Sequence, residues 1–500
     1  MIRRLLIANR GEVAWRIVRA CRELGIESVA VYSDADARAP HVTAADRACA
    51  IGPAAAAGSY LSATPILDAA RQSGADAIHP GYGFLSENAA FADACVRAGF
   101  VFVGPPAAVI ARMGSKIDSR QAVSAAGVAV VPGETPDDQT DRGIRTALER
   151  VGLPAILKAS AGGGGKGMRR VMTLDGLDES IQAARREAVA AFGDGTLYVE
   201  RLVDSPRHVE VQVLGDAHGA LVHLFERECS VQRRHQKIIE ESPSPSLTPG
   251  LRARITTAAV TAARAAGYRN AGTIEFLVDL STGGDRAPFY FLEMNTRLQV
   301  EHPVTEQVTG LDLVRAQLLV ASGERLPWRQ EDISQRGHAI EARVYAEDPG
   351  RGFLPQAGRL WLYREPRWPG VRVDSGVVEG GEVSVHYDPL IAKVIASAET
   401  RDLALARLLS ALRAFPILGV RTNIPFLLRV LEHPRFQSGT VDTGFLDREG
   451  ATLAEGPPAD TPAFVRAAMS AYSERPQSGP DAGSAEAPVD PWSSLHGWGR

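Results

Sequence analysis

Carboxylate and amide side chains interrupt two apolar segments in the second half of this 500-residue chain. Glu275 stands in the first segment, and Glu293 and Asn295 stand in the second, with a glycine pair between the segments. Aromatic and β-branched residues dominate both, which predicts adjacent strands, with a hairpin as one form of the pairing. Because strand side chains alternate between faces, Glu293, Asn295 and Arg297 are predicted to share one face.

Polar groups in an apolar strand are costly unless a positive charge lies among them. One arrangement is a buried ion pair with Arg297, which a lone glutamate would favour. The other is a divalent cation, since oxygen ligands of this kind suit Mg²⁺ or Mn²⁺ held together with substrate phosphates. Three polar groups on one face, followed by Arg297-x-Gln299-x-Glu301, favour the metal–phosphate site.

A run of glycines, Gly162 to Gly165 followed by Lys166-Gly167, gives a backbone that can approach phosphates closely. It is not a P-loop, because no Ser or Thr follows Gly-Lys and no helix is predicted next. A linker is the alternative interpretation of a glycine run. The strand-like segments on both sides favour a lid that covers phosphates.

A dense basic block extends from Arg227 to Lys237. A solvated surface or a nucleic-acid patch is the usual interpretation of such a block. Here the block is short, Cys229 and Val231 interrupt it, and the net charge of the chain is −4, so an anion site is a fair alternative. Together with the glycine run and the paired glutamates, it predicts an enzyme that positions ATP phosphates and a second small anion.

Composition limits the class of protein further. The length predicts about three domains, and a net charge of −4 gives no support for binding to nucleic acid or an anionic membrane. The four cysteines show neither Cys-x-x-Cys nor zinc spacing, which predicts reduced thiols in a cytoplasmic protein. The apolar segment after Met1 is too short for a signal peptide, and no run reaches the length of a transmembrane helix.

The amino-terminal elements predict the scaffold that carries these groups. In chain order they are the strand Leu5–Ala8, the helix Glu12–Leu24, the strand Ser28–Tyr32, a Gly/Pro loop at 79–88, a helix at 89–98 and the strand Phe100–Val103. The β-α-β order predicts an α/β domain with a parallel sheet. Loops beyond the carboxyl ends of such strands bind ligands, and the loop at 79–88 lacks the Gly-x-Gly-x-x-Gly pattern of nicotinamide-binding domains.

These motifs together resemble those of the biotin carboxylases, an ATP-grasp family. The matching segments are Ile7–Glu12, His79–Asn88, the glycine run with its flanks at 158–168, Pro206–Glu210, Gln232–Lys237 and Glu293–Pro303. They span residues 1–447 in an order that chance would rarely reproduce. The resemblance implies an α/β fold with a doubly wound amino-terminal α/β domain at 1–115, an ATP-grasp domain at 116–330 with a mobile glycine-rich lid at about 130–203, a biotin carboxylase carboxyl-terminal domain at 331–447, and a Pro/Ala/Gly/Ser-rich linker or tail at 448–500, where a further region would begin.

The resemblance also implies roles for the matched residues. ATP would be bound by Lys116 and Lys158 at its phosphates under Gly164 and Gly165, by Glu200, Arg201 and Val203 at the adenine edge, by His208, Gln232 and His235 beside the nucleotide, and by Glu275 and Glu293 through the metal. Mg²⁺ or Mn²⁺ would be held by Glu275, Glu293 and Asn295. Bicarbonate would be held by Lys237, Arg297, Gln299, Val300 and Glu301. The catalytic set would be Arg297, Lys237, Glu301 as general base, and Arg343, which would bind biotin and stabilise its ureido oxygen.

Two positions depart from the family pattern. Arg201 replaces the Lys that is common at the adenine edge, and Ala161 replaces a Gly at the start of the lid. Neither changes the implied reaction. Bicarbonate would attack the γ-phosphate of ATP to give carboxyphosphate, which releases CO₂ beside biotin.

The implied partners are a biotin carboxyl carrier protein, a carboxyltransferase that acts on acetyl-, propionyl- or methylcrotonyl-CoA, and a second copy in a homodimer. The family attaches biotin to a lysine in a Met-Lys-Met setting, and no methionine of this chain neighbours a lysine. Biotin is therefore expected as a carrier-bound substrate and not as a group attached to this chain.

Two rival functions remain open at this point. Another bicarbonate-activating ATP-grasp ligase, such as half of a carbamoyl-phosphate synthetase, shares part of the Arg297–Glu301 pattern, but a second equivalent half is expected there and no internal repeat is present. A catalytically silent nucleotide-binding regulator is the other rival. Intact Lys237, Glu301 and Arg343 argue against it.

Overall fold

The amino-terminal domain is built on a five-stranded parallel sheet. The structure is a computed structural model, and it describes residues 1–160 and 167–455. The strand order is β3-β2-β1-β4-β5, with β1 Arg4–Ile7, β2 Glu27–Tyr32, β3 Arg47–Ala50, β4 Ala77–His79 and β5 Val101–Phe102. The helices are α1 Gly11–Leu24, α2 Pro40–Ala44, α3 Ala63–Ser73, α4 Ala89–Arg97 and α5 Ala107–Gly114. The predicted parallel sheet is confirmed. Gly25 ends α1 in the left-handed conformation, with φ of 68°, that glycine adopts without strain.

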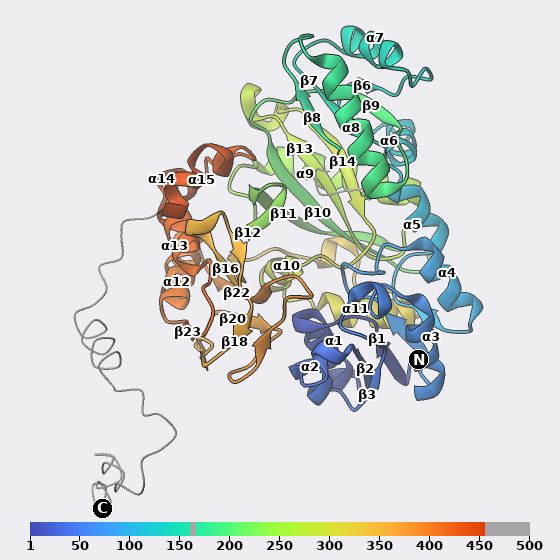
Figure 1. The fold of residues 1–500 in the computed structure, drawn as a ribbon, viewed down its shortest axis with the longest axis vertical. Coiled ribbons are helices and arrows are strands. Elements are labelled where there is room, and N and C mark those ends of the chain that lie inside the picture. The colour runs from blue at the N-terminus through green and yellow to red at the C-terminus, as the bar shows by residue number, and fades with distance from the viewer. Residues whose placement is uncertain (161–166, 456–500) are drawn as a thin grey trace, which may run out of the picture. The chain divides into compact units, whose positions relative to one another are not determined.

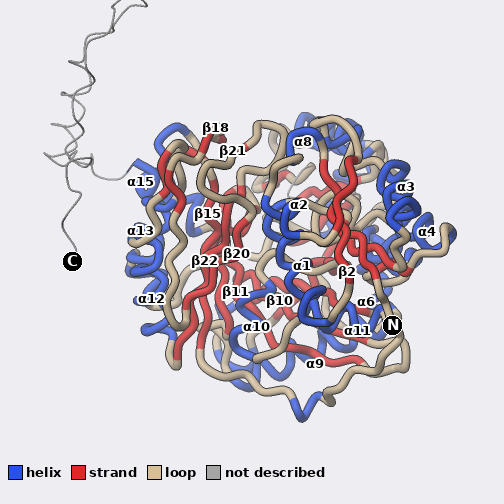
Figure 2. Tube along the Cα trace, turned by 90° about the horizontal axis from the view of Figure 1, so that it is seen from below, coloured by secondary structure: helices blue, strands red, loops and turns tan. Residues whose placement is uncertain are grey.

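A large antiparallel sheet forms the centre of the molecule. Its order is β14-β13-β10-β11-β12-β15-β22-β20, with β10 Arg207–Gly215, β11 Leu221–Arg233, β12 Gln236–Ser242, β13 Asn270–Val278, β14 Phe289–Asn295, β15 His338–Tyr345, β20 Val371–Ser375 and β22 Leu390–Ala398. The sheet crosses residue 330, so strands on both sides of that expected domain boundary belong to one hydrogen-bonded unit. Figure 2 shows β10, β11, β20 and β22 within this array.

Helices cover the large sheet and join it to the amino-terminal domain. α9 Pro249–Ala266 packs against β10 and β11, α10 His302–Thr309 packs against β12, β15 and β22, and α11 Leu313–Ala321 contacts both α1 and β13. Apolar side chains from α1 and α11 share one buried cluster. The amino-terminal domain is therefore packed directly on the sheet that carries the predicted site.

The predicted lid region is a separate layer with its own core. Its four-stranded sheet has the order β6-β9-β7-β8, with β6 Gly133–Glu134, β7 Ala155–Ala159, β8 Arg169–Val171 and β9 Leu197–Arg201. The helices α7 Asp141–Val151 and α8 Leu177–Phe192 pack on it, and α6 Lys116–Ala125 leads into it (Figure 1). Strands on both sides of the glycine run confirm the predicted strand flanks.

The carboxyl-terminal part adds short strand pairs and four helices around β15 and β22. The pairs are β16 Glu347–Asp348 with β17 Leu354–Pro355, β18 Gly358–Arg359 with β21 Glu382–Val383, and β19 Leu362–Tyr363 with β23 Ile417–Leu418. The helices are α12 Arg401–Arg413, α13 Ile424–Glu432, α14 Pro434–Gln437 and α15 Phe445–Glu455. All four cysteines are free thiols, as predicted. Over the described ranges, no helix combines the length and apolarity needed to cross a bilayer.

Candidate functional site

The predicted strand pair exists and places its acidic residues opposite each other. β13 and β14 are antiparallel, and Glu275 is the register partner of Glu293. The Nδ2 atom of Asn295 donates a hydrogen bond to Oε1 of Glu275 at 2.8 Å. One detail of the prediction is wrong. β14 ends at Asn295, so Arg297 lies beyond the strand and reaches the site from the segment that leaves the sheet.

Of the two facing glutamates, only Glu275 forms an ion pair within the described residues. Burial and the neighbouring Glu275 carboxylate raise the pKa of Glu293, and Lys116 only partly opposes this. Within the described ranges, no protein group donates a hydrogen bond to the Glu293 carboxylate. Mg²⁺ prefers oxygen ligands and is usually held by one or two carboxylates together with substrate phosphates. The residues present therefore fit a divalent cation.

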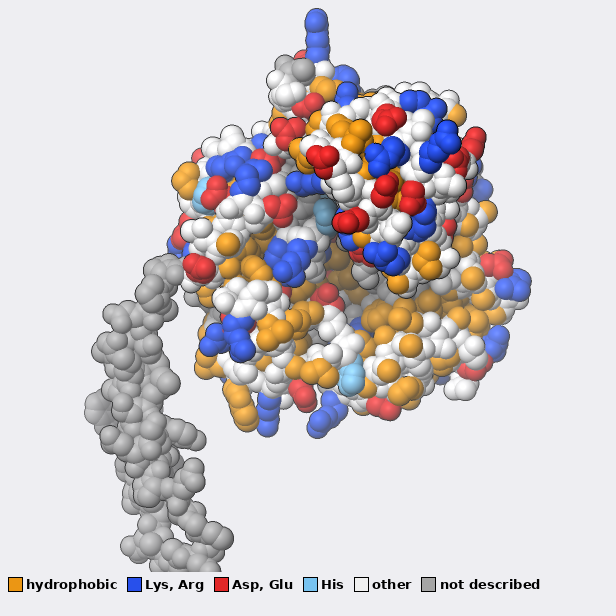
Figure 3. Space-filling view, turned by 45° about the horizontal axis from the view of Figure 1, so that its top comes forward, with side chains coloured by type: hydrophobic (Ala, Val, Ile, Leu, Met, Phe, Trp, Pro, Cys, Tyr) orange, Lys and Arg blue, Asp and Glu red, His pale blue; other side chains and the backbone are white. Residues whose placement is uncertain are grey.

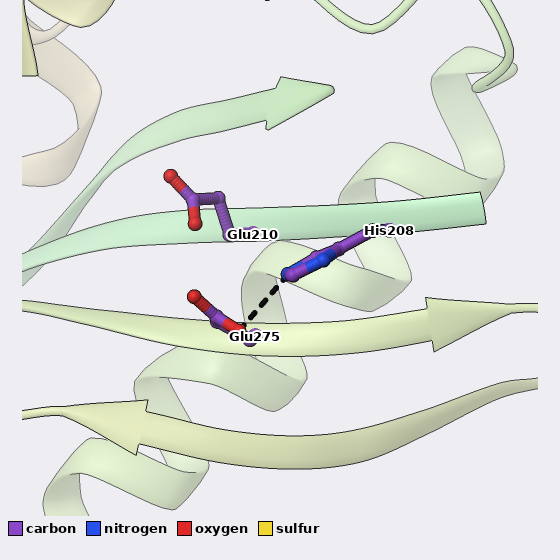
Figure 4. Close-up of side chains that lie close together, drawn as sticks. All are labelled: His208, Glu210 and Glu275. Carbon is purple, nitrogen blue, oxygen red and sulfur yellow. Dashed lines mark ion pairs between the residues drawn. The ribbon is translucent and has the colours of Figure 1, made fainter. Parts of the chain in front are cut away.

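A second acidic cluster lies beside the first (Figure 4). The ligand atoms of His208, Glu210 and Glu275 lie within 4.8 Å of one another, and His208 Nε2 is 2.9 Å from Glu275 Oε2. Burial opposes the charge on both groups, but their mutual attraction outweighs it and raises the pKa of His208. Burial likewise opposes ionisation of Glu275, but Lys237 and His208 together lower its pKa.

Lys237 is the cation at the centre of this part of the site. Its Nζ atom lies 2.5 Å from Glu210, 2.7 Å from Glu275 and 2.8 Å from Glu301. Burial would lower the pKa of Lys237, but the three carboxylates raise it well above its ordinary value. The ammonium is therefore charged at neutral pH and is fully occupied by carboxylate partners.

Glu301 and Arg343 form the next layer of the site. The Arg343 guanidinium contacts Glu301 Oε2 at 2.9 Å, and its Nε donates to Glu240 at 2.6 Å. Burial opposes ionisation of Glu301, yet Lys237 and Arg343 together hold its pKa well below the usual range. Glu301 is thus an ionised, fully buried carboxylate that can accept a proton.

All of the predicted bicarbonate residues except Lys237 lie on one turn of the chain, between β14 and α10. Arg297 donates to Gln299 Oε1 at 3.0 Å and to Glu87 Oε2 at 2.9 Å. Gln299 is buried, and its Nε2 atom has no hydrogen-bond partner among the described residues. An unpaired buried amide donor is costly unless a ligand accepts its hydrogen bond. Its position beside Arg297 suits a small anion.

The basic block at 227–237 divides into two parts, so its interpretation as a single anion site is only partly correct. Gln232, His235 and Lys237 face the cavity. Arg227 is fully buried and bonds to Glu210, Gln212, Thr273 and Thr305, which makes it a structural cross-link between β10, β11, β13 and α10.

The residues predicted to bind the nucleotide line the other end of the site. Lys158 and Arg120 both pair with the Glu200 carboxylate. Without a nucleotide, the Lys158 ammonium is therefore already paired with a carboxylate of the protein. Burial lowers the pKa of Lys116. Arg201, the departure from the family pattern, donates to the Tyr290 hydroxyl at 3.2 Å.

A single cavity of about 600 Å³ unites these groups. Its walls include every described residue of the predicted set, namely Lys116, Lys158, Glu200, Arg201, Val203, His208, Gln232, His235, Lys237, Glu275, Glu293, Asn295, Arg297, Gln299, Val300, Glu301 and Arg343. Gly164 and Gly165 lie outside the described residues. The space-filling view shows the molecule hollowed on one face, with Lys, Arg, Asp and Glu side chains around the hollow (Figure 3).

Sequence reasoning missed three residues that hold the site together. Glu87 bonds to Arg297, Glu240 bonds to Arg343, and Lys393 donates to the Val300 carbonyl at 2.8 Å. A usable signal existed for one of them, since Lys393 interrupts an apolar strand as Glu275 does. Glu240 is followed by Glu241 and Ser242 in a largely polar strand and gives no such signal. Glu87 lies in the 79–88 loop, whose distance from Arg297 no local pattern reveals.

Comparison with known protein families accounts for most of the chain. Residues 1–110 match the model of the biotin carboxylase N-terminal domain, residues 115–329 match the ATP-binding domain of the carbamoyl-phosphate synthase L chain, and residues 341–448 match the biotin carboxylase C-terminal domain. The ATP-binding match is therefore flanked on both sides by biotin carboxylase domains.

Curated relatives and solved structures agree with the family matches. Biotin carboxylase of Halalkalibacterium halodurans is 50% identical over 89% of this chain and 97% of its own length. The mitochondrial methylcrotonoyl-CoA carboxylase subunit alpha of Rattus norvegicus is 51% identical, and this chain spans 63% of its length. The biotin carboxylase domain of Hydrogenobacter thermophilus 2-oxoglutarate carboxylase, solved as a dimer with MgADP and bicarbonate, has a TM-score of 0.86 at 44% identity over 91% of this chain and 99% of that one.

Proposed function

This chain belongs to the biotin carboxylase family, and from that membership we propose that it carboxylates carrier-bound biotin with ATP and bicarbonate. The observation that carries the proposal is the cavity that joins an ionised, buried Glu301 and the Arg343 guanidinium to a lysine- and carboxylate-lined nucleotide end.

Bicarbonate activation is assigned to the turn at 297–301. Arg297, Lys237 and the free Gln299 amide are positioned to hold the anion, while Lys116 and Lys158 neutralise charge on the ATP phosphates. When bound at Glu275 and Glu293, Mg²⁺ would neutralise phosphate charge. Phosphoryl transfer depends mostly on such positioning and charge neutralisation.

Carboxyl transfer to biotin is assigned to Glu301 and Arg343. The ureido nitrogen is a poor nucleophile until it loses its proton, so a carboxylate that is ionised at neutral pH is the required acceptor. The Arg343 guanidinium, 2.9 Å from Glu301, would stabilise the negative charge that develops on the ureido oxygen. Base and oxyanion partner are thus adjacent.

We base the proposed partners on relatives that are longer than this chain. This chain spans 60–63% of the first methylcrotonoyl-CoA carboxylase alpha subunits that it matches. We propose a biotin carboxyl carrier protein or domain as the biotin source, a carboxyltransferase that passes the carboxyl group to an acyl-CoA, and assembly as a homodimer, the form in which the Hydrogenobacter thermophilus domain was solved.

The decisive experiment measures ATP hydrolysis by the purified chain. The proposal requires that turnover depend on Mg²⁺ and bicarbonate and rise when free biotin is added. ATP turnover indifferent to bicarbonate would refute it, and ammonia-dependent formation of carbamoyl phosphate would support the rival ligase.

A further inference from the structure

A fully buried lysine lies directly behind the turn that carries Arg297, Gln299 and Glu301. Lys393 belongs to β22, and its side chain is 0% exposed. Its Nζ atom donates to the Val300 carbonyl at 2.8 Å and lies 3.2 Å from Oε1 of Glu12. Lysine is almost never fully buried unless it is paired, so this position needs a reason.

The turn has little regular structure to hold it in place. β14 ends at Asn295 and α10 begins at His302, so the bicarbonate residues occupy the irregular connection between them. Three side chains contact its carbonyl groups. Arg297 donates to Leu298 at 3.1 Å from within the turn. From outside it, Lys393 donates to Val300, and His302 Nδ1 lies 2.8 Å from the Gln299 carbonyl. Burial and the nearby Lys393 ammonium hold the pKa of His302 well below its ordinary value, so this neutral ring donates through Nδ1.

The lysine is held in turn from the amino-terminal domain. Glu12 lies in the first turn of α1 and also accepts a hydrogen bond from the Tyr82 hydroxyl. Asp374 of β20 is a more distant counter-charge, 3.9 Å from the ammonium. Since α1 contacts both β20 and β22, three separate elements meet at this one ammonium.

From this geometry we propose that Lys393 is a positioning residue for bicarbonate, which fixes the Val300 carbonyl and thereby the turn from Arg297 to Glu301, with Glu12 holding the ammonium in place. The proposal rests on the proposed biotin carboxylase function and adds a residue pair to it. Neither side chain lines the cavity, so both act through the turn and not on a substrate directly.

The consequence of removing the ammonium is specific to one substrate. In Lys393→Met the Val300 carbonyl becomes a buried acceptor without a donor, and the turn must shift to satisfy it. The nucleotide residues Lys116, Lys158 and His208 lie on other elements. We therefore expect the KM for bicarbonate to rise about tenfold or more, with the KM for ATP unchanged within about twofold.

The test measures both KM values from bicarbonate-dependent ATP hydrolysis, with thermal unfolding of each variant alongside. Glu12→Gln is the second variant, because it keeps an oxygen acceptor but removes the charge, and it should raise the bicarbonate KM in the same direction by less. Glu241→Gln is the matched control. Glu241 is also buried, on β12 of the same sheet, but it pairs with His338 and Arg401. Its variant should therefore lower thermal stability and leave the bicarbonate KM at the wild-type value.

Each outcome decides the proposal. A selective rise in the bicarbonate KM in Lys393→Met, and its smaller counterpart in Glu12→Gln, supports it. An unchanged bicarbonate KM, or a parallel rise in both KM values, overturns it and leaves the lysine a merely structural role. If Lys393→Met does not fold, an unchanged bicarbonate KM in Glu12→Gln overturns it. Wild-type ATP turnover that ignores bicarbonate would overturn the proposed function itself, a result separable from any variant.

Discussion

Glu301 is fully buried and is held between two cations. Lys237 and Arg343 each contact one of its oxygens, which keeps it ionised despite complete burial. If it is the base, Glu301→Gln should reduce turnover by about 10²-fold or more, a typical loss for general-base removal. The KM for ATP should change little. Steady-state kinetics beside the Glu241→Gln control would check this, and near-normal turnover would remove Glu301 from the mechanism.

Arg343 is predicted to act in biotin carboxylation and not in the ATP cleavage that precedes it. In the proposed reaction its guanidinium would bind biotin, while the lysines and the metal-binding carboxylates would support ATP cleavage. Arg343→Met should leave bicarbonate-dependent ATP cleavage and abolish most biotin carboxylation, as measured by phosphate release and by fixation of labelled bicarbonate. Equal loss of both activities would show that the arginine has a structural or phosphate-binding role instead.

Glu240 makes stability depend on pH in an unusual direction. Burial, only partly offset by Arg343, raises its pKa from 4.5 to about 7. A raised carboxyl pKa means that the folded state binds the proton more tightly, so this residue's contribution to stability is lost as pH rises from about 4.5 to 7. Glu240→Gln should therefore gain thermal stability relative to wild type at pH 8 and not at pH 5. A difference in Tm that stays constant across this range would contradict the assignment.

At the scale of elements, the strand pair β13–β14 was predictable because its signal is local. Alternation and a glycine-containing connection place Glu275 and Glu293 on neighbouring strands, and the structure pairs them in register. The prediction that the strand continues to Arg297 was wrong, since nothing local marks Asn295 as the strand end, but Arg297 and Asn295 do line one cavity with Glu293. The partners Glu87, Glu240 and Lys393 escaped because each meets the site through a contact far along the chain.

The strand pair β13–β14 also leads to a testable prediction about metal binding. Two facing carboxylates, of which Glu293 lacks a protein hydrogen bond among the described residues, gain most from a divalent cation. Glu293→Gln removes one ligand charge and should weaken Mn²⁺ binding in the presence of ADP by about tenfold or more. Electron paramagnetic resonance titration of free Mn²⁺ measures this without any turnover. Unaltered Mn²⁺ affinity would place the metal elsewhere.

At the scale of the whole molecule, the chain is predicted to act on biotin that it does not carry. A biotinyl lysine needs an exposed turn in the family's Met-Lys-Met setting, and no lysine here has a methionine neighbour. After incubation with biotin ligase, intact-mass spectrometry should show an unmodified chain, and carboxylation should require free biotin or an added carrier. A biotin adduct on any lysine of this chain would contradict the prediction.

The continuous central sheet limits how proteins of this architecture can exchange parts. The family boundary between residues 329 and 341 falls between β12 and β15, yet these strands are hydrogen-bonded neighbours, with Glu240 opposite Glu341. A crossover there would join two parts of one sheet from different parents. Glu240 of one parent would then face residue 341 of the other. Chimaeras made at that point would join strands from two parents inside the sheet that carries the predicted site. A junction before β6 instead takes all eight strands of this sheet from one parent. Recombination should therefore be tolerated at the lid and penalised at the place where the sequence families divide.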